Sequence, residues 1–235
     1  MHDIVIRGGT IIDGIGSAAF TGDVAIAGER IAGVGGKQGP ARREIDATGL
    51  LVTPGWVDVH THYDGQAMWD PLLGPSCWHG VTTTMFGNCG VGFAPVRPQH
   101  RGALMELMEG VEEIPGVVLD DGLTWEWESF PDFLDALERR PRAIDIAAQI
   151  AHHPLRVYVM GDRAIRLEAA SAEDIAEMCR LTIEHCARAP SASPPRARIP
   201  TRRRWERWCR RDMPGAKSCW ASAPRWAPSA RVPLA

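Results

Sequence analysis

The chain has 235 residues, of which 45% are hydrophobic and 23% are charged, and its formal net charge is −3. This is the composition of an ordinary globular protein, and the length allows one large or two small domains. No basic region followed by an apolar stretch opens the chain, and no apolar run approaches the roughly 18–20 residues of a membrane span. We therefore expect a cytoplasmic protein without membrane contacts, whose six cysteines are free thiols or metal ligands rather than disulfides.

Short β-strands are predicted throughout the first 52 residues. They are expected within residues 3–13, 23–34 (as a hairpin), 44–47 and 50–52. The glycine pair Gly8-Gly9 predicts a tight turn within the first of these segments. Because a unit this thin cannot bury a core alone, residues 1–52 are interpreted as part of a small β-sandwich.

From residue 53 to residue 188, buried strands alternate with helices. Strands are expected at 56–59, 81–86 and 143–151, and helices at 101–108, 130–139 and 171–186. Ser171 and Asp174 form a capping-box-like start for the last helix, and His185 is expected on its surface or at its C-terminal end. This alternation predicts a parallel α/β architecture, and three strand–helix units, where a barrel needs eight, predict an incomplete TIM (β/α)8 barrel.

Three side chains near the ends of these strands are candidate metal ligands. His60 and His62 follow the strand at 56–59, and side chains at i and i+2 of a strand point to the same side. Cys89 follows the next strand, and a thiolate there is a strong, soft ligand for zinc. The alternatives are polar histidines hydrogen-bonded to a loop and a cysteine acting as a small buried hydrophobe.

Several segments together resemble a known family. They are Ile6–Gly14, Pro54–His62, Gly80–Thr83, Gly87–Gly90, Ala151–Arg156 and Val159–Gly161. Residues 1–186 resemble the amidohydrolase superfamily, and more closely its N-acyl-D-amino-acid deacylase (D-aminoacylase) branch. In that branch a cysteine replaces the carboxylated lysine of other members.

The resemblance implies a hydrolase of N-acylated D-amino acids or related amides, acting through metal-activated water. It implies that Cys89 binds one tightly held zinc, and that His60 and His62 line an adjacent, weaker metal position. His152 matches a histidine that could lie near substrate; its alternative is a strand-end histidine bonded to a backbone carbonyl. The family's catalytic aspartate has no counterpart in this chain, so the catalytic residue is unknown and little turnover is expected.

The composition changes after residue 186. Residues 1–186 carry 14 basic and 27 acidic residues, whereas residues 187–235 carry 12 basic and 2 acidic residues, with 8 of the 18 prolines and 4 of the 9 tryptophans. A one-base shift of the reading frame from Pro190 onward permits a string that resembles the family's fourth-strand segment. We therefore interpret residues 189–235 as an aberrant, disordered tail that is translated out of frame. Resequencing the DNA after codon 186 tests this interpretation.

Two other functions stay open. One is a different amidohydrolase, such as a dihydroorotase-like or hydantoinase-like hydrolase of cyclic amides. The other is a non-catalytic fragment whose basic tail, around Arg202–Trp205, binds nucleic acid. The expected partner is a small N-acyl amino acid or related amide. Binding to a membrane or to a nucleic acid is not expected, and the oligomeric state is unknown.

Overall fold

The structure is a computed structural model that describes residues 1–187 and 197–198. The chain divides into two compact units, one from Met1 to Trp56 and one from Val57 onward. The sequence places this division four residues earlier, at residue 52.

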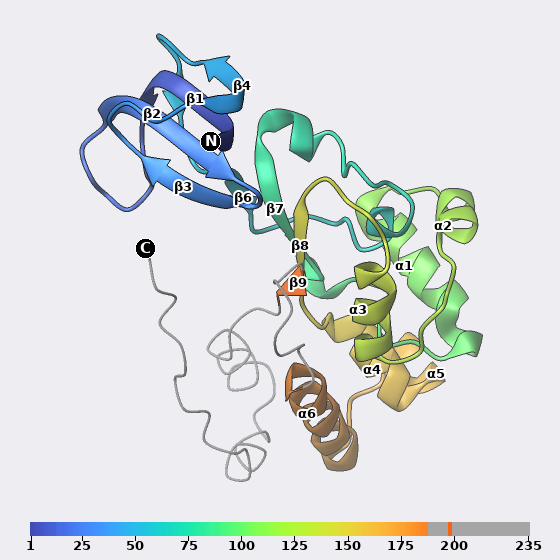
Figure 1. Ribbon diagram of the computed structural model, residues 1–235. Helices are drawn as coiled ribbons and strands as arrows, with labels where there is room; N and C mark the ends of the chain where they lie inside the picture. The colour runs from blue at the N-terminus through green and yellow to red at the C-terminus, as the bar shows by residue number, and fades with distance from the viewer. Residues whose placement is uncertain (188–196, 199–235) are drawn as a thin grey trace. The chain divides into compact units, whose positions relative to one another are not determined.

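The first unit contains one five-stranded sheet (Figure 1). Its strands are β1 (His2–Ile11), β2 (Phe20–Ala27), β3 (Arg30–Val34), β4 (Ala41–Asp46) and β5 (Leu51–Val52). The order is β3-β2-β1-β4, and β5 also pairs with β1. The predicted hairpin is formed by β2 and β3, which pair antiparallel.

The predicted turn at Gly8-Gly9 is wrong. Residues 2–11 form one continuous strand, and its pairing with β2 shifts register between Ile6 and Gly9. Gly8 has φ +64, so the glycine pair makes a bulge within the strand instead of ending it.

The second unit contains a four-stranded sheet in which β6 (Trp56–Asp58), β7 (Val81–Phe86), β8 (Asp145–Ala148) and β9 (Ala197–Arg198) lie side by side (Figure 1). β7 pairs with β8, and β8 with β9, in parallel. Parallel neighbours joined by helices give this unit the predicted α/β architecture. The predicted disordered tail included residues 197 and 198, and this is wrong because they form β9. The rest of the predicted tail lies outside the described residues.

Six helices are described in this unit. They are α1 (Arg101–Glu112), α2 (Gly116–Gly122), α3 (Phe130–Glu138), α4 (His152–Met160), α5 (Asp162–Ile165) and α6 (Ala172–Ala187), with single 3-10 turns η1 (Gln66–Met68), η2 (Ser76–His79), η3 (Asn88–Gly90) and η4 (Pro98–His100). α1, α3 and α6 were predicted, whereas α2, α4 and α5 were not. The start predicted for α6 is confirmed, because Asp174 accepts from the Ser171 backbone N–H at 2.8 Å while its own N–H donates to the Ser171 hydroxyl at 3.2 Å.

The core of this unit is an aromatic and aliphatic cluster that joins the sheet to the helices. Phe86 of β7, Phe133 of α3 and Trp127 are each at most 3% exposed. The Trp127 indole N–H donates to the Phe93 carbonyl oxygen at 2.7 Å, so its polar atom is satisfied inside the core. No helix in the described part of the chain is long and apolar enough to span a bilayer.

His185 lies in the last turn of α6, as predicted, but not on its surface. His185 is buried, at 5% exposure, and its ring stacks on Phe130 with 6.3 Å between ring centroids. Ile183, an apolar residue near the same end of the helix, is 40% exposed. At its C-terminal end, α6 therefore packs the face that carries His185 against the core, and not the face that carries Ile183.

Candidate metal centre

The two candidate histidines lie just beyond β6 and are fixed by the residue between them. The Thr61 backbone N–H and hydroxyl both donate to the Met85 carbonyl oxygen at 2.9 Å, and the same hydroxyl lies 2.8 Å from that of buried Thr84. The carboxylate of Asp58 accepts from the His60 backbone N–H at 3.1 Å, a structural role. Because β6 ends at Asp58, the expectation that the strand's own alternation aligns the imidazoles is wrong; the anchor at Thr61 aligns them.

The third candidate lies in a turn that requires glycine. Gly87 has φ +82, and a Cβ there would lie 2.1 Å from the Gln149 carbonyl oxygen. The Asn88 side chain donates to the Met85 carbonyl oxygen at 3.0 Å and accepts from the Gln149 amide at 2.8 Å. Cys89 itself has φ +53, a conformation that costs a non-glycine residue of the order of 1–2 kcal/mol. The turn therefore holds Cys89 in a backbone conformation that a cysteine outside such a turn disfavours.

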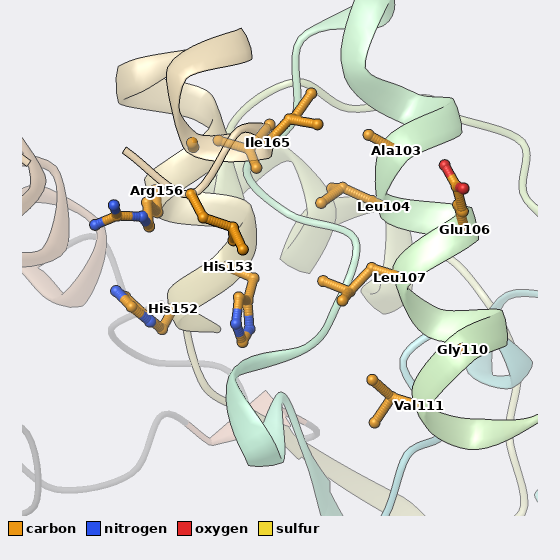
Figure 2. A pocket seen from close by; sticks show the side chains of 13 residues that line it. Ala103, Leu104, Glu106, Leu107, Gly110, Val111, His152, His153, Arg156 and Ile165 are labelled. Atoms are coloured by element: carbon orange, nitrogen blue, oxygen red, sulfur yellow. The ribbon is translucent and has the colours of Figure 1, made fainter. Parts of the chain in front are cut away.

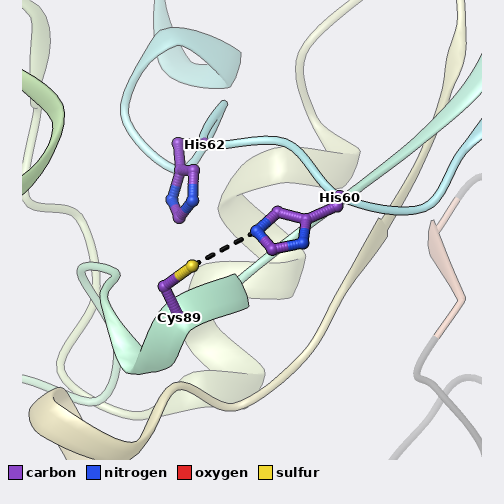
Figure 3. A group of neighbouring side chains, drawn as sticks. All are labelled: His60, His62 and Cys89. Carbon is purple, nitrogen blue, oxygen red and sulfur yellow. Dashed lines mark hydrogen bonds between the residues drawn. The ribbon is translucent and has the colours of Figure 1, made fainter.

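These two segments bring three donors together (Figure 3). One ligand atom each from His60, His62 and Cys89 lies within 4.8 Å of the other two. Nε2 of His60 is 3.2 Å from Sγ of Cys89, and the two imidazole centroids are 5.5 Å apart at 60°. His60 and Cys89 are exposed while His62 is half-buried, so the cluster is open to solvent on one side.

His62 has a distinct environment. Its Nε2 lies 3.3 Å from Oε1 of Glu112, at the end of α1. Burial lowers the pKa of His62, the nearby Glu112 carboxylate opposes that shift, and His60 adds to it. The lowered pKa favours a neutral imidazole at neutral pH, the form that binds metal ions.

The donor set fits a divalent metal ion with an affinity for sulfur and nitrogen. Nδ1 of His62 is buried and has no hydrogen-bond partner among the described residues, which leaves a ring nitrogen for another bond. Two imidazoles and one thiolate are the ligand types that zinc prefers in proteins.

Asp64, two residues after His62, was not singled out from the sequence. Its side chain is only 2% exposed, and its Oδ2 has no hydrogen-bond partner within the described part of the chain. Burial raises the pKa of this carboxyl well above its ordinary value. The group is therefore protonated over a wider pH range than an exposed aspartate. An acid closely following the histidine pair was the sequence signal that could have drawn attention to it.

A groove of about 680 Å³ lies between α1 and the pair α4 and α5, and His152 is on its wall (Figure 2). His152 was predicted at a strand end but begins α4, and it does not belong to the donor cluster. The neighbouring His153 donates from Nδ1 to the Gly90 carbonyl oxygen at 2.7 Å. Since Gly90 follows Cys89, the α4 wall of the groove contacts the turn that carries the thiol.

The other wall is formed by α1, which also ends at the cluster. Leu104, Leu107 and Val111 face the groove from this helix, and Glu112 comes next in the sequence. The groove is therefore bounded by the two elements that support the donor residues, and its lining is largely apolar.

The sequence model of the Amidohydrolase family matches residues 43–201. A D-aminoacylase of Alcaligenes xylosoxydans xylosoxydans is 36% identical over 183 residues, covering 77% of this chain and 35% of the relative. The chain thus spans about a third of the length of that curated relative.

Two solved structures show the same fold over most of the chain. One is a D-aminoacylase described by its binuclear metal center, with one-metal activation and second-metal attenuation; it is 34% identical with a TM-score of 0.66, covering 80% of this chain and 37% of that one. The other is an N-acyl-D-glutamate deacylase from Bordetella bronchiseptica with zinc and a phosphonate inhibitor; it is 31% identical with a TM-score of 0.66, covering 79% and 36%.

Proposed function

The chain belongs to the amidohydrolase family, and on that basis we propose that it is the metal-binding part of an enzyme that hydrolyses N-acyl-D-amino acids. The observation that carries the proposal is the cluster of His60, His62 and Cys89, whose ligand atoms lie within 4.8 Å of one another. The named relatives that act on N-acyl-D-amino acids support the substrate class.

The proposed metal is zinc, with one tightly bound ion and a weaker adjacent position. Cys89 would hold the first ion, and His60 and His62 would line the second position. The zinc in one solved relative and the binuclear center of another support this assignment. Bound zinc supplies a Lewis acid that polarises an amide carbonyl and lowers the pKa of water.

The described residues contribute binding and orientation in this scheme. Thr61 and the turn at Gly87 fix the donors, and the groove beside them is apolar enough for an acyl chain or an apolar side chain. We propose His152 as a residue near the substrate, because it lines this groove. Residues 53–188 would supply the first strands and helices of a (β/α)8 barrel, and residues 1–52 part of a β-sandwich.

Zinc binding and hydrolysis test the proposal separately. Zinc affinity would be measured by competition with a chromophoric chelator for the wild type, Cys89→Ser and the matched control Cys77→Ser, a free thiol outside the cluster. We expect Cys89→Ser to lose tight zinc binding and Cys77→Ser to retain it. A wild-type chain that binds no zinc would contradict the proposed metal site.

Hydrolysis would be assayed with N-acetyl-D- and N-acetyl-L-amino acids. We expect little turnover from these 235 residues alone, because no carboxylate joins the donor cluster in the described part of the chain. Rapid hydrolysis of the D-substrates that Cys89→Ser abolishes would support the reaction but refute the expected inactivity. Rapid hydrolysis that Cys89→Ser leaves intact would refute the site.

A further inference from the structure

Glu112 occupies a special position at the end of α1. It is the last residue of the helix, and Glu113 then takes φ +57, which ends the helix and turns the chain away. The Glu112 side chain is only 24% exposed, whereas Glu106 and Glu109 of the same helix are exposed. Of these three acids of α1, Glu112 is thus the one turned from solvent.

The Glu112 carboxylate faces one nitrogen of His62. Its Oε1 lies 3.3 Å from Nε2 of a ring whose side chain is 16% exposed. A carboxylate attracts a proton on the nearer ring nitrogen, so this contact favours the tautomer of His62 that carries its proton on Nε2. The other nitrogen, Nδ1, then keeps its lone pair, and it is the nitrogen that has no hydrogen-bond partner among the described residues.

Glu112 does not belong to the donor cluster itself. The ligand atoms that lie within 4.8 Å of one another come from His60, His62 and Cys89 in the described chain. A carboxylate beside a ligand histidine, but outside the ligand set, fixes the tautomer and the orientation of the ring and raises its basicity.

We propose that Glu112 is a positioning residue for the metal centre, holding the His62 imidazole in the tautomer and orientation that bind the metal. The inference rests on the proposed metal site. It makes α1 a functional element, because the last turn of this helix delivers the carboxylate.

The experiment measures metal binding and needs no activity. Zinc affinity of the chain would be determined by chelator competition for the wild type, Glu112→Gln, Glu112→Asp and a control. The control is Glu106→Gln, which removes the same charge from an exposed position of α1 that does not contact His62. Cobalt(II) spectra of the same proteins would report the ligand field directly, and circular dichroism would verify folding.

We expect Glu112→Gln to weaken zinc binding at the position that His60 and His62 line by about 10- to 100-fold, with an altered cobalt spectrum. Glu112→Asp should give an intermediate affinity, and Glu106→Gln should bind zinc as the wild type does. Equal affinities for the wild type and a folded Glu112→Gln would overturn the inference while leaving the metal site intact. A wild type that binds no zinc would overturn both.

Discussion

Sγ of Cys89 and Nε2 of His60 lie 3.2 Å apart although 29 positions separate the two residues in the sequence. Two backbone features set this distance: the hydrogen bonds from Thr61 to the Met85 carbonyl oxygen and the glycine turn after β7. The geometry of the cluster is therefore sensitive to changes in residues that carry no donor atom.

Gly87→Ala tests that sensitivity. The added Cβ would lie 2.1 Å from the Gln149 carbonyl oxygen at a φ of +82, so the turn must move. We expect a loss of unfolding free energy of about 2–3 kcal/mol and weaker zinc binding, measured by urea denaturation and chelator competition. The control is Gly102→Ala on α1, where a Cβ meets nothing within 4 Å; unchanged stability in Gly87→Ala would show that the turn does not depend on glycine.

Local sequence patterns predicted the elements whose residue types are unambiguous. β7 was predicted at its observed bounds, because the β-branched run from Val81 ends at a glycine. His152 was assigned to a strand end, although Pro154 suits the first turn of the helix that begins there. The burial of His185 depends on Phe130, a partner far away in sequence that no local pattern reveals.

The candidate site shows the same difference between residues that a local pattern reveals and residues that depend on the fold. The motif identified His60, His62 and Cys89, which the structure brings together. Glu112 was missed because the helix was predicted to end at residue 108, four residues short of its last residue. The position of Glu112 depends on how far α1 extends. Gly110 disfavours a helix, and it therefore indicated an earlier end than the one observed.

Asp64→Asn tests the buried carboxyl. Because burial raises the folded-state pKa above the unfolded value of about 3.9, folding must take up a proton once the pH exceeds about 4. Wild-type stability should then fall as the pH rises above about 4, by up to about 1.4 kcal/mol per pH unit, until the pH reaches the raised folded-state pKa.

The asparagine variant cannot ionise and should lack this slope. Urea denaturation with a chelator present, at pH 4.5, 6 and 8, measures the difference between the two proteins. Parallel pH profiles for the wild type and Asp64→Asn would show that the carboxyl does not remain protonated on folding.

Asp23→Asn tests the first unit. Hydrogen bonds from the Gln38 N–H, the Arg7 guanidinium and the Gly8 N–H lower the pKa of Asp23 to about 2. Because the pKa of Asp23 is lower in the folded than in the unfolded protein, its charge stabilises the fold at pH values above the unfolded-state pKa. This stabilisation is lost as the pH falls from about 4 to about 2.

Asp23→Asn should therefore melt at a lower temperature than the wild type at pH 6, and the gap should narrow as the pH approaches 2. Thermal melts followed by circular dichroism measure it. Glu29→Gln, an exposed acid of the same unit, should match the wild type throughout. A gap that stays constant with pH would mean that the Asp23 charge makes no contribution.

All three donors of the proposed metal centre come from one continuous stretch, residues 60–89. A metal ion bound there closes a loop of 29 positions, a modest entropic cost for a chain that has not yet folded. During synthesis this stretch leaves the ribosome before any of α1 to α6, and domains fold from the N-terminal end at about 5–20 residues per second. None of the helices α1 to α6 is therefore needed to supply a donor atom to this cluster.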